Sequence, residues 1–241
     1  MSKKSREKFK SEKFKTMHNV FDEFTNRTIF KLISEGYFQG LESPISIGKE
    51  ANLFSAKSGE GRVMVKIYRL EACDFNKMWS YIKSDPRFLD LTGKKRKIIL
   101  AWVQREYRNL LKSREAGVIV PTPMTFKNNV IVMEFIGTGN ELAPKLKDLK
   151  PKNPKQFFNE ILSQMKKLYK AGLVHADLSA FNILNHNEKP VFIDFSQCTQ
   201  TSDPATGEYL KRDIRNICSF FRKLGLKLEE EKILKEVINQ R

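Results

Sequence analysis

Apolar residues recur along the chain with two spacings, one typical of helices and one typical of strands. Spacings of three and four predict helices, at 17–36, 97–116, 155–171, about 208–224 and about 228–240. Alternating or continuous apolar runs predict strands, at 45–68, 130–136 and 190–193. After a leading helix, strands dominate the first half of the chain and helices the second. This order predicts an α+β fold.

Two irregular segments interrupt these elements. Residues 70–97 are charged and contain breakers at Asp85-Pro86 and Thr92-Gly93, which predicts a long, mobile insertion with a helix near 75–82. Residues 137–140 are rich in glycine and follow a buried strand, as expected of a hinge between lobes. We therefore predict three parts: a basic tail with a helical extension over 1–40, an N-lobe over 41–136 and a C-lobe over 137–241.

The strongest candidate chemistry lies in the stretch 173–184 and the strand that follows it. Asp177 comes after an apolar lead-in, Asn182 stands five positions later, and Asp194 ends an apolar strand. Phosphoryl transfer needs such a set, because one carboxylate orients the attacking hydroxyl while a carboxylate and an amide oxygen hold the metal ions. Each residue alone is more often an ordinary loop or strand-end polar group. The set in this order predicts a kinase site.

The protein-kinase signatures are H-R-D-x-x-x-x-N followed by D-F-G. Here the first carries Ala176 between His175 and Asp177, and the second carries Ser196 where the glycine would stand. The first signature thus keeps its aspartate and its asparagine, and the second keeps its aspartate.

A lysine and a glutamate are candidates for a second feature of kinases. Lys66 projects from the strand that ends at Tyr68, where a phosphate-binding lysine belongs, although a lysine on an edge strand facing water is the ordinary alternative. Glu106 lies on the apolar stripe of helix 97–116, where an unpaired buried charge would be costly. An ion pair between Lys66 and Glu106 is predicted, as in active kinases. The alternative is that Glu106 reaches solvent at the edge of the stripe.

The turn 46–52 contains one glycine followed by lysine, which fits neither a Walker loop nor G-x-G-x-x-G and is weak evidence for phosphate binding. The connector at 134–136 offers exposed backbone at Glu134 and Ile136, which could hydrogen-bond an adenine.

Charge changes this picture most. The chain of 241 residues has 44 Lys and Arg against 28 Asp and Glu, a net charge of +16, which favours a polyanionic partner, RNA first. A highly charged surface selected for stability or solubility is the alternative. Three scattered cysteines suggest a reducing compartment, so we expect a cytoplasmic protein. No apolar run reaches the roughly 20 residues of a membrane span.

These residues together resemble a family. The run Lys49-Glu50-Ala51-Asn52 after Gly48, the strand 65–69, the insertion, the strand 133–137 and the stretch 173–184 resemble the RIO family of atypical serine/threonine protein kinases. The likeness is to its type-1 subfamily, in an archaeal-like minimal form, and runs from about residue 16 to about 225. It implies a bilobal kinase-like fold that is trimmed, lacking the activation loop and peptide-docking helices.

The resemblance also implies roles for individual residues. Asp177 matches the catalytic aspartate, and Asn182 and Asp194 match the metal ligands. Lys66 and Glu106 match the ion pair on the nucleotide phosphates. The remaining matches line the nucleotide pocket: Ser46, Lys49 and Asn52 in the phosphate loop, Met133 at the back wall of the adenine pocket, and Glu134 and Ile136 at the hinge.

The implied cofactors are ATP and Mg²⁺, with Mn²⁺ as an expected substitute. The implied activity is that of a serine/threonine kinase or ATPase in small-ribosomal-subunit maturation, in which Asp194 can itself take the phosphate. The implied partners are the precursor of the small subunit with its rRNA, and a protein substrate or the chain itself through autophosphorylation; no membrane partner is expected.

Two alternatives remain open. A small-molecule kinase resembling aminoglycoside or choline phosphotransferases would usually carry glycine and a second histidine where Ala176 and Ser179 stand here. An RNA-associated assembly factor that uses ATP as a conformational switch, without a protein substrate, fits the same residues as the kinase.

Overall fold

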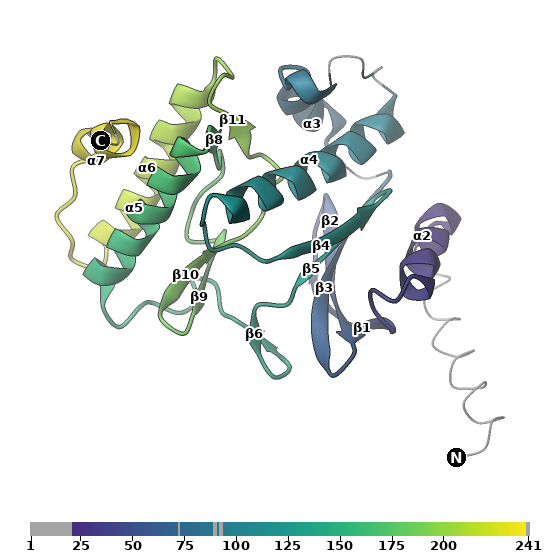
Figure 1. Cartoon of the computed structure of the whole chain (residues 1–241). Coiled ribbons are helices and arrows are strands. Elements are labelled where there is room, and N and C mark those ends of the chain that lie inside the picture. Colours follow the sequence, from purple (N-terminus) through teal and green to yellow (C-terminus); the bar gives the residue numbers. More distant parts are fainter. Residues whose placement is uncertain (1–20, 72, 89–90, 92–93, 240–241) are drawn as a thin grey trace. The chain divides into compact units, whose positions relative to one another are not determined.

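The computed structural model describes residues 21–71, 73–88, 91 and 94–239 (Figure 1). They form two compact units, one made of the chain up to Cys73 with Thr125–Val132, the other of Asp74–Met124 with Met133 to the C-terminal end. This division groups helix 97–116 with the second unit, whereas the sequence placed it in the N-lobe, and the three predicted parts stay a prediction. Residues 1–20, which hold the predicted basic tail, lie outside the described residues.

The first unit is built on an antiparallel sheet. Its strands follow the order β1-β2-β3-β5-β4, and β4 and β5 belong in part to the second unit. The bounds are Gly40–Ile47 for β1, Ala51–Ser58 for β2, Gly61–Tyr68 for β3, Pro123–Lys127 for β4 and Val130–Glu134 for β5. The sequence predicted strands over β1, β2, β3 and β5 but none over β4.

Helix α2, Glu23–Ser34, packs on this sheet. Asp22 caps it by accepting a hydrogen bond from the backbone N–H of Thr25 at 2.9 Å, so the helix begins where a side-chain acceptor satisfies an end N–H. Ile29 and Leu32 are buried in one cluster with strand residues such as Val65 and Val130. The leading helix therefore packs into the core of the first unit.

The second unit contains the insertion and most of the helices. The insertion forms α3, Phe75–Ile82, and the short 3-10 helix η1, Pro86–Phe88, and α3 packs on α4, Lys95–Glu115. The described part of the insertion is packed, contrary to the expected loose segment, because Met78 and Ile82 are fully buried. The remaining elements are β6 Gly137–Thr138, β7 Glu141–Leu142, α5 Pro154–Lys170, β8 Leu173–Val174, β9 Ile183–His186, β10 Lys189–Phe192, β11 Thr199–Gln200, α6 Thr206–Arg222 and α7 Glu230–Ile238.

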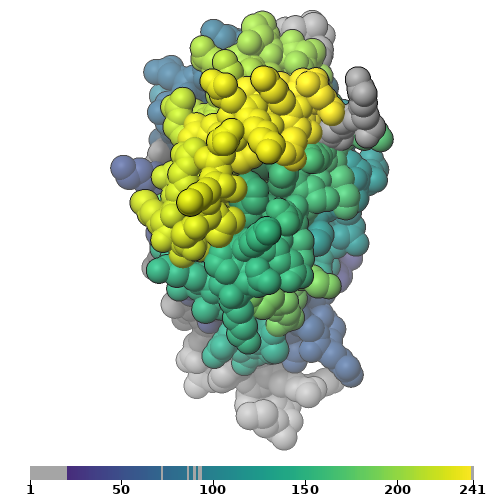
Figure 2. All heavy atoms as spheres, turned by 90° about the vertical axis from the view of Figure 1, so that its left-hand side faces the viewer, coloured from purple at the N-terminus to yellow at the C-terminus, as the bar shows by residue number. Residues whose placement is uncertain are grey.

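The helices α5, α6 and α7 lie together in this unit, and Figure 2 shows the C-terminal residues in yellow against the green of α5. Phe157 and Phe158 of α5 contact Phe221 of α6 through their rings. Gly172, with φ of +74°, ends α5 and turns the chain into β8, a conformation that favours glycine. This packing fixes the start of the candidate catalytic loop.

The architecture is a mixed α and β fold in two units, which confirms the predicted fold class. Helix α6 begins at Thr206, soon after Asp194, so the described chain between them has no room for an activation loop. Among the described residues, no helix has the length and apolar character that crossing a membrane requires.

Candidate active site

The loop after β8 carries Asp177 and is held by helix α6. The carboxylate of Asp213 accepts hydrogen bonds from the backbone N–H groups of Ala176 and Leu178, both at 2.8 Å. The guanidinium of Arg212 donates to the carbonyl of Ala176. Ala176 has φ of +64°, a conformation that costs a residue with a side chain free energy, so these contacts hold a strained turn beside Asp177.

Asp213 is a buried acid with a structural task. Burial raises its pKa to about 7, against the lowering effect of the two backbone hydrogen bonds and Arg212. Each carboxylate oxygen accepts one N–H from the loop, so the group is satisfied although its side chain is almost fully buried. Asp213 therefore acts on Asp177 through the backbone of the loop.

Asn182 lies directly against Asp177. Its side-chain amide N–H groups donate to the Asp177 carbonyl at 2.8 Å and to Asp177 Oδ2 at 3.0 Å. With its nitrogen committed to Asp177, the amide oxygen of Asn182 is the atom that remains for a metal ion. The structure thus brings together two residues that the sequence placed in one site.

Asp194 stands next to this pair. It follows β10, and the backbone N–H of Ile193 donates to the carbonyl of Asn182 at 3.0 Å. The side chain of Asp194 is exposed and accepts a hydrogen bond from Ser196 Oγ at 2.8 Å. Burial raises the pKa of Asp177, and the negative charge of Asp194 raises it further. Two carboxylates that repel each other in this way form a site that a cation would stabilise.

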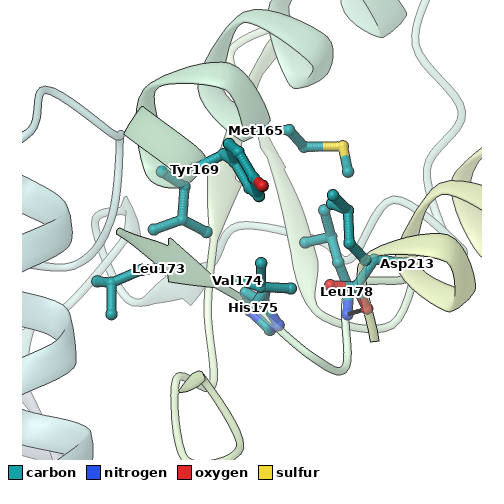
Figure 3. A pocket seen from close by; sticks show the side chains of 9 residues that line it. Met165, Tyr169, Leu173, Val174, His175, Leu178 and Asp213 are labelled. Atoms are coloured by element: carbon teal, nitrogen blue, oxygen red, sulfur yellow. Dashed lines mark hydrogen bonds between the residues drawn. The ribbon is translucent and has the colours of Figure 1, made fainter. Parts of the chain in front are cut away.

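The side chain of His175 contacts the segment that carries Asp194. Its Nε2 lies 3.0 Å from the carbonyl of Ile193, and its ring packs 4.8 Å from the ring of Phe195. Figure 3 shows His175 and Asp213 beside a small cavity of about 10 Å³. Burial lowers the pKa of His175 to about 4, so the ring is neutral at pH 7 and serves as packing and as a hydrogen-bond donor.

The loop after Asp194 is anchored to helix α4. Arg105 Nη1 donates to the carbonyl of Ser196 at 2.9 Å, and Asn109 Nδ2 donates to the carbonyl of Cys198 at 2.7 Å. Both side chains are fully buried. The backbone on either side of Gln197 is therefore fixed by α4.

A buried ion-pair network joins this anchor to the insertion. Asp85 Oδ2 accepts from Arg105 Nε at 3.1 Å and from Arg87 Nη2 at 2.6 Å. Burial alone would raise the pKa of Asp85, but the two arginines outweigh it and the pKa lies below its ordinary value. Arg87 also donates to Asn109 Oδ1 at 3.1 Å. The insertion, α4 and the loop after Asp194 thus share one polar network.

Lys66 and Glu106 are both buried, each in its own unit. Lys66 stands on β3, an inner strand of the sheet, with 8% of its surface exposed and Nζ 5.2 Å from the centre of the Tyr68 ring. Glu106 stands on α4 with 1% exposed. Neither is the solvent-facing residue of the ordinary alternatives. The ion pair between them joins two units and stays a prediction.

The phosphate-loop residues lie around the turn between β1 and β2. Ser46 and Lys49 are exposed, whereas Asn52 is buried and stands opposite Ile47. The backbone N–H of Gly48 donates to the carbonyl of Ala51 at 3.1 Å. The three candidate residues are therefore neighbours within the first unit.

The hinge residues follow one another at the end of β5. Met133 and Ile136 are buried, and the Glu134 carboxylate accepts hydrogen bonds from Thr122 N at 3.0 Å and Thr122 Oγ1 at 2.6 Å. A Cβ on Gly137 would lie 2.1 Å from the carbonyl oxygen of Glu141, so glycine is required there. The predicted hinge segment 137–140 lies within a tight hairpin of β6 and β7.

Sequence reasoning did not find several residues that shape the site. Asp213 lies on the buried stripe of α6 with Leu210 and Ile217, which is the signal that identified Glu106 on α4. Arg105 and Asn109 stand three and seven positions after Trp102 on the buried stripe of α4, so the same signal was available for them. Gln197 and Tyr81 gave no such signal. Their partners are distant in sequence, so only the fold brings them together.

The chain is similar to known proteins of one family. A family model described as the RIO domain matches residues 52–233. The RIO-type serine/threonine-protein kinase Rio1 of Haloferax volcanii is 40% identical over 216 residues, covering 89% of this chain and 74% of its own length. The protein of the same name from Methanocaldococcus jannaschii is 43% identical over 213 residues, covering 88% and 73%.

The fold is also that of a solved kinase. The Rio2 kinase of Chaetomium thermophilum, in an ADP/Mg²⁺-phosphoaspartate complex, matches with a TM-score of 0.68 and 22% identity over 89% of this chain and 66% of its own. The fold and the named relatives therefore define the class as a trimmed, kinase-like enzyme. The chain belongs to the RIO family of atypical serine/threonine-protein kinases, and the two archaeal relatives place it with the type-1 members, as the sequence indicated.

Proposed function

We propose that the chain transfers the γ-phosphoryl group of Mg-ATP at the site formed by Asp177, Asn182 and Asp194. The observation that carries this proposal is their proximity within one unit: Asn182 donates to Asp177 at 3.0 Å, and the charge of Asp194 raises the pKa of Asp177. Asp177 orients the attacking hydroxyl and accepts its proton. Asn182 and Asp194 hold the metal.

The donor atoms fit Mg²⁺, with Mn²⁺ as a substitute. Magnesium prefers oxygen ligands, usually one or two carboxylates completed by phosphates and water. Asn182 and Asp194 offer an amide and a carboxylate oxygen. Among the described residues, no group of three or more His, Cys, Asp or Glu side chains is placed to hold a metal alone, which suits a site completed by nucleotide phosphates. Bound there, the metal would neutralise phosphate charge.

Lys66, with Glu106 as its proposed ion-pair partner, and the turn with Ser46, Lys49 and Asn52 would bind the nucleotide phosphates. Met133 would form the back wall of the adenine pocket, with the backbone of Glu134 and Ile136 at the hinge. The burial of Lys66 and Glu106 supports this, because two buried opposite charges need partners.

Two acceptors are compatible with the site. In the first reaction a serine or threonine hydroxyl attacks the γ-phosphorus, its proton passes to Asp177, and the bond to the bridging oxygen of ADP breaks. In the second, Asp194 Oδ attacks the γ-phosphorus, the bond to the bridging oxygen breaks and ADP leaves; water then hydrolyses the phosphoaspartate to inorganic phosphate and the free carboxylate. The phosphoaspartate in the Rio2 kinase complex supports the second reaction for this chain.

We further propose that the activity serves maturation of the small ribosomal subunit in the cytoplasm. Support comes from the net charge of +16, because a basic surface binds the phosphates of rRNA. An assembly factor that uses ATP only as a switch is the second candidate, favoured by the same phosphoaspartate. A small-molecule phosphotransferase gains no support from the site.

The test measures turnover of labelled Mg-ATP by the wild-type protein and by Asp177→Asn and Asp194→Asn. Each variant keeps the side-chain volume but loses a charge, and we expect a loss of about 100-fold or more in kcat. If both variants match wild type, the site assignment is wrong. Hydroxylamine-labile phosphate on the wild type that is absent from Asp194→Asn, with no phosphorylated serine or threonine, would favour the switch over the kinase.

A further inference from the structure

A hydrogen-bonded chain connects the insertion to Asp177. Tyr81 of α3 donates its hydroxyl to Gln197 Oε1 at 2.9 Å, and Gln197 Nε2 donates to Asp177 Oδ2 at a longer 3.4 Å. The ionised carboxylate of Asp177 can only accept a hydrogen bond, and this fixes which group donates in each of the two bonds. The amide nitrogen of Gln197 must therefore face Asp177 and its oxygen must face Tyr81.

Both linking side chains are rigidly placed. Tyr81 is 7% exposed, and its ring stacks 5.5 Å from Tyr209 and meets Trp102 edge-on at 5.9 Å. Gln197 is 9% exposed, and α4 fixes the carbonyls of the residues on either side of it. Neither side chain has room to take another rotamer without giving up these interactions.

These hydrogen bonds determine which carboxylate oxygen of Asp177 can accept a proton from the substrate. Asn182 and Gln197 both donate to Oδ2, which leaves Oδ1 as the oxygen that faces a substrate hydroxyl. Lys77, one helical turn before Tyr81 on α3, adds a positive charge that lowers the pKa of Asp177. One face of the insertion helix is thus directed at the carboxylate.

We propose that Tyr81 and Gln197 are positioning residues that hold the Asp177 carboxylate in the orientation for accepting the hydroxyl proton. The inference rests on the proposed function. It makes α3 of the insertion a part of the catalytic apparatus, because packing of this helix on α4 sets the orientation of Asp177. Neither residue touches the reacting atoms.

The experiment compares Tyr81→Phe, Gln197→Met and the double variant in phosphate transfer from Mg-ATP to dephosphorylated casein. Tyr81→Phe removes the hydrogen bond to Gln197, whereas Gln197→Met removes both that bond and the bond to Asp177, and each change keeps the packing volume. We expect kcat to fall about 3–10-fold in each variant, as for loss of ordinary hydrogen bonds, while KM for ATP stays within about twofold. Because Gln197→Met already breaks both hydrogen bonds, the double variant should lose no more kcat than Gln197→Met alone.

Two further variants separate positioning from general damage. Tyr169→Phe removes a hydroxyl from α5 in the same unit, where it makes no hydrogen bond among the described residues, and should keep kcat within about twofold of wild type. Gln197→Glu keeps an acceptor for Tyr81 but sets a carboxylate against Asp177. It should therefore lose more kcat than Gln197→Met.

The outcomes are distinguishable from failure of the proposed function. A wild-type protein that transfers no phosphate, or an Asp177→Asn variant that is fully active, overturns the site itself. An active wild type with unchanged kcat in Tyr81→Phe and Gln197→Met overturns only the inference. Decreases in kcat that multiply in the double variant, or an equal effect on KM, also overturn it. If Tyr81→Phe fails to fold, the comparison of kcat between Gln197→Met and Gln197→Glu tests the inference, which requires the larger loss in Gln197→Glu.

Discussion

The behaviour of His175 illustrates how burial tunes a single residue at the site. The ring is 1% exposed and its pKa is lowered from 6.5 to about 4, first by burial. Between these values the unfolded chain binds a proton that the folded chain does not, so stability is present above about pH 6.5 and is lost as the pH falls toward 4. The gap corresponds to about 3 kcal/mol at most.

The prediction is made for His175→Gln compared with wild type. The free energy of unfolding of wild type, minus that of the variant, should fall as the pH is lowered from 7 to 4, as measured by urea denaturation. A difference that stays constant over this range would mean that the histidine is protonated in place. The difference is needed because Asp213, with a raised pKa, loses its contribution in the opposite direction, as the pH rises through about 7.

At the scale of elements, the ion-pair network that joins the insertion to α4 is asymmetric. Asp85 forms ion pairs with two arginines, Arg87 and Arg105, whereas the fully buried Arg105 pairs with the single carboxylate of Asp85. Asp85→Ala leaves a buried guanidinium without a counter-charge, and we expect a loss of about 3–5 kcal/mol in the free energy of unfolding. Arg105→Met leaves Asp85 paired with Arg87, so the expected loss is about 1–3 kcal/mol. Urea denaturation measures both.

The double variant is the control for this argument. Combining Asp85→Ala with Arg105→Met removes the stranded charge, so the double variant should be more stable than Asp85→Ala alone. If the losses simply add, the cost of Asp85→Ala does not come from an unpaired Arg105, and the network is weaker than its geometry indicates.

The sequence predicted elements with strong periodicity and missed those that depend on contacts. Helix α5 and the core of the insertion, α3, were placed within a residue or two, because apolar spacing and Gly172 marked them. The strand β4 and the hairpin at Gly137 were missed, since they are short and are formed by pairing. In the site, Asp177, Asn182 and Asp194 follow a known spacing. Tyr81 and Gln197 lie 116 positions apart and meet only in the fold.

At the scale of the whole molecule, the sequence gives the net charge, whereas the structure shows where individual charges lie. The amino-acid composition sets a net charge of +16 but not its location. The structure shows that helix α4 begins with Lys94 as N-cap, followed by Lys95, without an acidic residue in the first turn or a side-chain cap. Positive charge at a helix N-terminus opposes the helix dipole, so this end is less stable than it would be with an acidic cap.

Contact with the proposed rRNA would explain why these two lysines stand at the N-terminus of α4, where their charge destabilises the helix. Lys94→Asp should then separate stability from binding. A capping carboxylate should raise the free energy of unfolding by about 1 kcal/mol, measured in urea, while affinity for a fragment of small-subunit rRNA falls. The slope of log affinity against log salt should decrease by about 0.9 for each phosphate that the variant no longer neutralises.

The matched control is Lys227→Asp, the same charge change at an exposed position between α6 and α7. This variant tests whether rRNA affinity depends on where the positive charge lies or only on the net charge of the protein. If rRNA is bound at the start of α4, Lys227→Asp should weaken binding less than Lys94→Asp at the same salt concentration. Equal losses would mean that the net charge attracts RNA diffusely. The unfavourable charge at the N-terminus of α4 would then need a cause other than rRNA.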